Sequence, residues 1–218
     1  MSPAAQGDLS PLFQELGLSP SEQQTAMLSR YLDLLQHWNA TYNLTAVRER
    51  AAMITQHLAD CLAIIPALQR EFPAGRVLDV GSGGGLPGVV IATMLPALDV
   101  TCVDAVGKKM AFVRQVAGTL PLPNLHAAHA RVEALKAAAF DLVVSRAFAT
   151  LANFVGLTRA QLVPKGVWLA MKGRVPDDEI AALPPDVTVF HVEQLQVPRL
   201  DAQRCLVWMR HAAAAPQN

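Results

Sequence analysis

The segment from Leu78 to Gly88 (LDVGSGGGLPG) carries the clearest chemical signal in the sequence, because five of its eleven residues are glycines. An apolar run precedes it, and a predicted helix opens at about Pro87. Glycines let the backbone approach a ligand closely, and a helix N-terminus offers free N–H groups. The segment therefore predicts a cofactor-binding loop at the carboxyl end of a central strand. A turn that binds nothing is the alternative.

The identity of the cofactor depends on acidic residues around the loop. Gly83 to Gly88 also fits the GxGxxG fingerprint of nicotinamide enzymes, and Asp104 at the end of the next predicted strand would accept hydrogen bonds from ribose hydroxyls. Asp79 stands where methyltransferases place an acid near the methionine end of S-adenosylmethionine. The only tyrosines, Tyr31 and Tyr42, fall in predicted N-terminal helices, away from any hydride site. An S-adenosylmethionine-dependent methyltransferase is favoured over a nicotinamide-dependent oxidoreductase.

The elements that must position these residues follow an α/β pattern. From Arg76 onward short apolar runs alternate with helical stretches, which predicts a parallel sheet covered on both faces. After Pro185 two runs follow without a long helix between them, which predicts an antiparallel ribbon at one sheet edge. The predicted strands are Val77 to Val80, Val100 to Val103, Leu125 to Ala128, Leu142 to Val144, Val167 to Met171, Val187 to Leu195 and Cys205 to Arg210.

The fold class expected is a Rossmann-like α/β methyltransferase sheet, mostly parallel, with an N-terminal helical extension. The extension is placed at 1–72, the cofactor-binding domain at 73–210 and a disordered tail at 211–218.

Within the extension, Ser19-Pro20-Ser21-Glu22 predicts a helix start, with the hydroxyl as N-cap and the acid closing a capping box. Asn39 to Thr45 predicts the break before a second helix. His57 and Asp60 lie one turn apart there. A catalytic pair or a fragment of a metal site are the alternatives, and the favoured interpretation is a hydrogen-bonded pair that ties the extension to the sheet. The predicted buried stripes are Leu28, Tyr31, Leu32, Leu35 and Trp38 on the first helix, and Met53, Ile54, His57, Leu58, Cys61, Leu62 and Ile65 on the second.

Composition limits the class of protein. Hydrophobic residues make up 52% of the 218 residues and charged residues 17%, which predicts a folded domain with a sizeable core. The formal net charge is zero, so an RNA substrate would need local basic patches. Three widely spaced cysteines predict neither disulfides nor a zinc site, and we expect no metal. No secretory signal or membrane-spanning stretch is expected, so the predicted location is cytoplasmic.

The ordered motifs resemble one family along about residues 12 to 210. Trp38-Asn39, Tyr42 to Thr45, His57, Asp60 and Asp79 to Gly88 are similar to the glucose-inhibited division protein B family, the bacterial small-subunit rRNA guanine-N7 methyltransferases. The match continues through Gly107-Lys108-Lys109, Arg114, Arg131-Val132-Glu133, Ser145-Arg146-Ala147, Lys172-Gly173, Pro198, Leu200-Asp201 and Arg204. Two residues depart from the family pattern: Gly84, where proline is usual, and Cys61, where serine is common.

The resemblance implies S-adenosylmethionine as cofactor and 16S rRNA as partner, within the 30S subunit or a precursor, for a monomeric enzyme. A non-catalytic partner protein that binds S-adenosylmethionine is the other alternative. The implied cofactor-binding residues are Gly81, Gly83, Leu86, Asp104, Val132, Glu133 and Arg146. The basic residues expected to contact RNA are Lys108, Lys109, Arg114, Lys172 and Arg204, with Arg174 and Arg199 near them.

The chemistry of such a reaction needs no general base, because guanine N7 carries no proton at neutral pH. Most of the rate would come from holding N7 and the methyl group in line, and no catalytic residue is assigned. Two rival classes of methyltransferase lack their motifs. Amine methyltransferases usually carry an Asn/Asp-Pro-Pro-aromatic tetrapeptide, but Pro184-Pro185 is followed by Asp186. Cytosine-C5 methyltransferases need a Pro-Cys nucleophile, and no cysteine in this sequence follows a proline. Phe148 is a candidate for stacking on a base, although core packing is the ordinary role of a phenylalanine.

Overall fold

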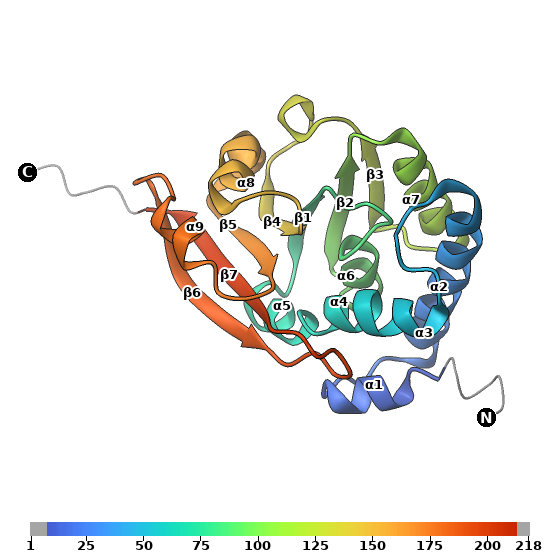
Figure 1. Cartoon of the computed structure of the whole chain (residues 1–218). Helices are drawn as coiled ribbons and strands as arrows, with labels where there is room; N and C mark the ends of the chain where they lie inside the picture. Colours follow the sequence, from blue (N-terminus) through green and yellow to red (C-terminus); the bar gives the residue numbers. More distant parts are fainter. Residues whose placement is uncertain (1–7, 213–218) are drawn as a thin grey trace, which may run out of the picture.

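The computed structural model describes residues 8–212, which form a seven-stranded sheet with helices on both faces (Figure 1). The strand order is β3-β2-β1-β4-β5-β7-β6. Strands β1 to β5 pair in parallel, whereas β7 pairs antiparallel with both of its neighbours. The predicted α/β class with an antiparallel edge ribbon is confirmed. The strands are β1 Gly75–Val80, β2 Leu98–Asp104, β3 Leu125–His129, β4 Phe140–Arg146, β5 Leu162–Lys172, β6 Val187–Leu195 and β7 Arg204–His211.

All seven predicted strands coincide with observed ones, and β5 differs most in its bounds. It begins at Leu162 rather than Val167. The exposed Pro164 and Lys165 interrupt its apolar pattern, so the early part was not recognisable as a strand. Near the C-terminus, His211 belongs to β7, which contradicts the prediction that a tail starts at residue 211. The predicted tail from 213 to 218 lies outside the described residues.

The helices cover the sheet in two layers. One buried cluster joins α2, α6 and α7 to one sheet face through residues such as Leu32, Phe112 and Val100. The other joins α8 to the opposite face, through Phe154 and Trp168. The helical segments are α1 Ser10–Glu15, α2 Glu22–Tyr42, α3 Arg50–Met53, η2 Ile54–Ala59, α4 Asp60–Leu62, α5 Ile65–Glu71, α6 Gly88–Met94, α7 Gly107–Thr119, η3 Val132–Ala134, α8 Leu151–Thr158, η4 Arg159–Gln161 and α9 Asp177–Ala181.

Helix α2 starts two residues later than the sequence pattern predicted. Its N-cap is Ser21, not Ser19, and the capping box is closed by Gln24 rather than Glu22. The Ser21 hydroxyl accepts from the Gln24 N–H at 3.1 Å, and the Gln24 side chain accepts from the Ser21 N–H at 2.8 Å. A glutamine at the third helical position serves this motif as well as a glutamate. The helix then continues to Tyr42 and ends within the segment predicted as the break, Asn39 to Thr45.

The helical run from Arg50 to Glu71 contains six residues of π-helix, at Ile54–Ala59. By length and hydropathy this run could cross a membrane, but 67% of its most apolar 18-residue window is buried inside the protein. Its apolar side chains, including Leu58 and Leu62, are fully buried in the cluster that packs on the sheet. The run is therefore a core helix, and its stripe matches the prediction except that His57 is half-buried.

Candidate functional site

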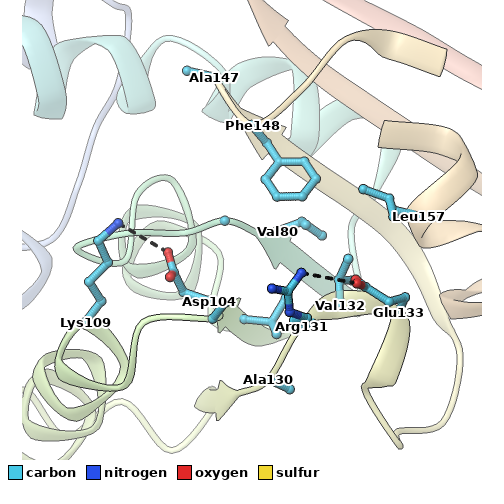
Figure 2. A pocket seen from close by; sticks show the side chains of 13 residues that line it. Val80, Asp104, Lys109, Ala130, Arg131, Val132, Glu133, Ala147, Phe148 and Leu157 are labelled. Carbon is cyan, nitrogen blue, oxygen red and sulfur yellow. Dashed lines mark ion pairs between the residues drawn. The ribbon is translucent and has the colours of Figure 1, made fainter. Parts of the chain in front are cut away.

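A cleft of about 400 Å³ opens at the carboxyl ends of β1, β2 and β4 (Figure 2). We call it the glycine-loop cleft. Figure 2 shows the Phe148 ring pointing into it above Val80, with Leu157 on the far wall. Carboxyl ends of parallel strands are where open α/β sheets bind ligands. The lining residues are Val80, Gly81, Val103, Asp104, Ala105, Lys109, Ala130, Arg131, Val132, Glu133, Ala147, Phe148 and Leu157.

Asp104 joins the two loops that form the floor of this cleft. One carboxylate oxygen accepts from the Gly83 N–H at 3.1 Å, and the other accepts from the Val106 N–H at 2.8 Å. The ammonium group of Lys109 lies 3.6 Å from the carboxylate. A carboxylate has about four acceptor positions, so Asp104 keeps capacity for the two hydroxyls of a ribose.

The glycine loop takes the shape that its sequence predicted. Gly81, Gly83 and Gly85 have positive φ angles of 66°, 58° and 87°, a backbone region that favours glycine. A Cβ at Gly81 would lie 2.5 Å from the Phe148 ring, so only glycine fits there. Beside Gly83, the nearest atom to such a Cβ would be 4.0 Å away, so the loop leaves open space for a ligand.

A second cavity, of about 130 Å³, is lined by the glycine loop and shares Gly81 with the cleft. We call it the loop cavity. Gly83, Leu86 and Arg146 line it, together with Thr45 and His57 from the N-terminal extension. All seven residues predicted to bind the cofactor thus line two adjoining spaces: Gly81, Asp104, Val132 and Glu133 the cleft, and Gly81, Gly83, Leu86 and Arg146 the loop cavity.

A buried polar atom of the loop fits a polar ligand. The hydroxyl oxygen of Ser82, a residue that lines the loop cavity, is buried without a hydrogen-bond partner among residues 8–212. Buried polar groups are normally satisfied, so such orphans occur preferentially where a ligand or water completes the site. Backbone N–H groups and one guanidinium as donors, with one carboxylate as acceptor, suit a zwitterionic nucleoside such as S-adenosylmethionine.

Asp79 does not reach either cavity, which corrects its expected position beside the cofactor. It is fully buried beneath the loop, where Oδ2 accepts from the N–H of Gly88 at 2.7 Å. Burial raises the pKa of this carboxyl from 3.8 to about 7, although the hydrogen bond from Gly88 acts in the opposite direction. Through this hydrogen bond Asp79 fixes the start of α6, so it shapes the loop without contacting a ligand in either cavity.

A third cavity, of about 480 Å³, lies between the π-helical segment and the ends of β5 and β7. It shares His57 and Arg146 with the loop cavity and Ala147 with the glycine-loop cleft. Because Arg146, Lys172 and Arg204 line it, we call it the arginine cavity. Its full lining is Gln56, His57, Asp60, Arg146, Ala147, Met171, Lys172, Gly173, Leu200 and Arg204.

The basic residues predicted to contact RNA do not form one patch. Lys172 and Arg204 line the arginine cavity, whereas Lys109 lines the glycine-loop cleft. Lys108 and Arg114 are exposed on α7 and line none of the three spaces. The two residues named beside this set also divide: Arg199 forms an ion pair with Glu15 of α1 at 2.8 Å, and Arg174 is exposed in the loop after β5.

The expected hydrogen bond between His57 and Asp60 is absent from the described residues. His57 Nε2 instead lies 2.6 Å from the Thr45 hydroxyl, and Asp60 accepts from Arg146 and Arg204. Asp60 therefore does tie the extension to the sheet, but through arginines distant in sequence. Within residues 8–212 no group of three or more His, Cys, Asp or Glu side chains could hold a metal ion.

Three features of the site were missed or misjudged from sequence. Leu157 of α8 forms a wall of the cleft, and nothing distinguishes it in sequence from core leucines. Tyr31 donates to the carbonyl oxygen of Gly84 at 2.8 Å and so braces the glycine loop from the N-terminal extension. Phe148 is 37% exposed and faces Gly81, so it does not pack in the core, which is the ordinary role of a phenylalanine.

Comparison with known proteins gives a family match over most of the chain. The family model described as rRNA small subunit methyltransferase G matches residues 24–207. A protein of Acidovorax sp. (strain JS42), named ribosomal RNA small subunit methyltransferase G, is 58% identical over 208 residues, covering 91% of this chain and 92% of its own. The protein of the same name from Bordetella avium is 52% identical and covers 96% and 95%.

Solved structures of lower identity share the fold. TrmN from Thermus thermophilus aligns with a TM-score of 0.56 at 20% identity, over 73% of this chain and 53% of its own. The Burkholderia thailandensis 1,6-didemethyltoxoflavin-N1-methyltransferase, solved with bound S-adenosylhomocysteine, aligns with a TM-score of 0.57 at 15% identity, over 84% and 90%. These likenesses confirm the Rossmann-like methyltransferase fold and its sheet.

Proposed function

The chain belongs to the rRNA small subunit methyltransferase G family, and we propose that it transfers a methyl group from S-adenosylmethionine to N7 of a guanine in 16S rRNA. Family membership makes it an rRNA methyltransferase and removes the oxidoreductase and the non-catalytic protein from consideration. The donor and the target atom are the proposed part. The main support for this proposal is that the glycine-loop cleft meets a cavity lined by cations at the same edge of the sheet.

The donor would occupy the glycine-loop cleft and the adjoining loop cavity. Asp104 is suited to the ribose, and Val132 and Glu133 form the wall expected beside the adenine. Arg146, on the loop cavity, is suited to the methionine end. S-adenosylmethionine itself supplies an electrophilic methyl group on a sulfonium. The protein's part is to bind, orient and enclose it.

The acceptor chemistry is consistent with a site that lacks a general base. Guanine N7 attacks with a lone pair and has no proton to lose, so alignment and electrostatic complementarity supply the rate. His57 lines both the loop cavity and the arginine cavity. Burial lowers the pKa of His57, and Arg146 acts in the same direction. A neutral imidazole hydrogen-bonded to Thr45 is suited to positioning rather than to proton transfer.

The substrate is proposed to be rRNA presented by the 30S subunit or a precursor, in the cytoplasm, with the enzyme acting as a monomer. A net charge of zero supports a substrate presented by a particle, because a protein that bound free RNA broadly would need a basic surface. The cations at the sheet edge instead support local contact with one exposed nucleotide.

The test is transfer of tritiated methyl groups from S-adenosylmethionine to 30S subunits purified from a strain without its own copy of the enzyme. We expect label at a single guanine, located by strand cleavage specific for N7-methylated guanine. Naked 16S rRNA and precursor particles, assayed in parallel, identify the preferred form. Label at another ring atom would overturn the N7 assignment, and no label on any of the three would overturn the rRNA substrate.

A further inference from the structure

Three charged side chains in the arginine cavity, those of Asp60, Arg146 and Arg204, carry an unbalanced positive charge. Asp60 Oδ1 accepts from Nε of Arg204 at 2.8 Å, and Oδ2 accepts from Nη1 of Arg146 at 3.3 Å. The side chain of Asp60 is 6% exposed, and those of Arg146 and Arg204 are 21% and 26% exposed. Within residues 8–212 neither arginine contacts a second carboxylate, so two cations share one anion.

The other titratable groups of this cavity do not offset that charge. Lys172 is balanced by Glu179, whose carboxylate oxygens lie 2.8 and 3.1 Å from its ammonium nitrogen. The lowered pKa of His57, caused first by burial and then by Arg146, keeps the imidazole neutral near pH 7. The surplus charge therefore stays on the arginine pair.

Both guanidinium groups keep donors free for a ligand. Arg204 uses Nε on Asp60 and Nη1 on the carbonyl oxygen of Gln203, while Arg146 uses Nη1 on Asp60 and Gln56. In the part of the chain that the structure describes, Nη2 of each arginine has no partner. Guanidinium forks match phosphate oxygens, and a partly buried surplus charge costs free energy that a bound anion offsets.

We propose that the arginine cavity binds one backbone phosphate of the nucleotide to be methylated, with Arg204 as its ligand and Asp60 holding Arg204 and the adjacent Arg146 in place. This deepens the proposed function and rests on it. It assigns phosphate recognition to Arg204 and excludes Lys172, whose charge is already balanced. The rival occupant is the carboxylate of the methyl donor. Arg204 distinguishes the two, because it lines the arginine cavity and not the loop cavity.

The test measures binding of a labelled single-stranded RNA, about a dozen nucleotides with one guanine, to the full chain saturated with S-adenosylhomocysteine. Fluorescence anisotropy at several salt concentrations gives both Kd and its salt dependence. Arg204→Gln should weaken binding about tenfold and reduce the slope of log Kd against log salt by about 0.7, the value for one phosphate contact on a single strand. Arg204→Lys, which keeps the charge, should retain the slope while losing several-fold in affinity.

The matched control is Arg159→Gln, an arginine paired with Asp186 near the opposite end of β5. It should change neither affinity nor slope. An unchanged slope in Arg204→Gln, or an equal loss in Arg159→Gln, overturns the phosphate site. So does weaker binding of S-adenosylmethionine by Arg204→Gln in calorimetry, which would assign the cluster to the donor. If the slope changes as expected but wild-type protein methylates no 30S subunit, the phosphate site stands and the rRNA assignment fails.

Discussion

At the scale of single residues, Asp104 combines a structural role with a proposed binding role. Asp104→Ala would leave the N–H groups of Gly83 and Val106 without their acceptor, in addition to removing the ribose contact. We expect at least a tenfold loss of S-adenosylmethionine affinity in calorimetry, and a loss of about 1–3 kcal/mol in the free energy of unfolding.

Asp99 offers a control on the same strand. Its side chain is 48% exposed and contacts His126 and Arg76 at the strand's other end. Asp99→Ala should therefore leave cofactor affinity unchanged. Equal affinity in Asp104→Ala and wild type would contradict the ribose assignment.

Asp79 gives a pH dependence of stability whose sign is fixed by its burial. Burial raises the pKa of the folded-state carboxyl from 3.8 to about 7, so the folded protein holds the proton more tightly than the unfolded chain does. The stability from this group is complete below about pH 4 and is lost as the pH rises to about 7.

The variant Asp79→Asn lacks this titration and keeps an acceptor for the Gly88 N–H. The unfolding free energy of wild type relative to the variant should therefore fall by roughly 2–3 kcal/mol between pH 5 and pH 8. Urea unfolding of both proteins across this range measures it. A difference that stays constant with pH would show that Asp79 is ionised throughout.

At the scale of elements, Gln24 links the ends of two helices. Its carbonyl oxygen completes the capping box of α2, while its amide nitrogen donates to Thr93 and Met94 at the end of α6, at 3.0 and 3.2 Å. Gln24→Glu would keep the cap but place a carboxylate against carbonyl oxygens at a helix C-terminus. We expect a loss of about 1–2 kcal/mol in thermal or urea unfolding.

The adjacent Gln23 is exposed in the same first turn and provides the matched change. Gln23→Glu adds a negative charge near a helix N-terminus, so it should be neutral or slightly stabilising. If both variants lost the same stability, the contact between α2 and α6 would not be the cause.

The N-terminal extension also reaches the glycine loop, through Tyr31. Tyr31→Phe removes only the hydroxyl that donates to Gly84, from a side chain that is itself fully buried. We expect a loss of about 1 kcal/mol in stability and a few-fold weaker S-adenosylmethionine binding, because the loop would be less firmly held. Tyr42→Phe, at an exposed position, is the control. Unchanged cofactor affinity in Tyr31→Phe would limit the tyrosine to a packing role.

The elements themselves could be predicted from sequence where one periodic pattern fills one element. The ribbon strand Val187–Leu195 was predicted with its observed bounds, and the glycine loop with its helix start. Side-chain partners across distant elements could not be predicted. Asp60 pairs with Arg146 and Arg204, 86 and 144 residues away, while the nearer His57 bonds elsewhere. Sequence spacing orders contacts within a helix, but only the topology of the sheet sets contacts between strand ends.

At the scale of the whole molecule, the extension and the sheet share one hydrophobic core rather than forming two units. A single buried cluster contains residues from α1, such as Leu12, together with Leu32 of α2 and Trp208 of β7. Figure 1 shows α1 near the loop that joins β6 and β7, and the ion pair of Arg199 with Glu15 connects them. The boundary predicted at residue 72 therefore marks a change in sequence pattern, but the extension before it has no hydrophobic core of its own.

This shared core predicts one cooperative unfolding transition. The variant Trp38→Phe removes the tryptophan of the extension. The two that remain, Trp168 and Trp208, both lie in the sheet, so tryptophan fluorescence of this variant reports unfolding of the sheet. Far-UV circular dichroism at a helical wavelength is dominated by helices, including the long α2 of the extension. Since the two regions bury the same cluster, neither can unfold without exposing the other's apolar surface, and the two probes should give the same urea midpoint. Two separate midpoints would mean that the extension folds as a unit of its own.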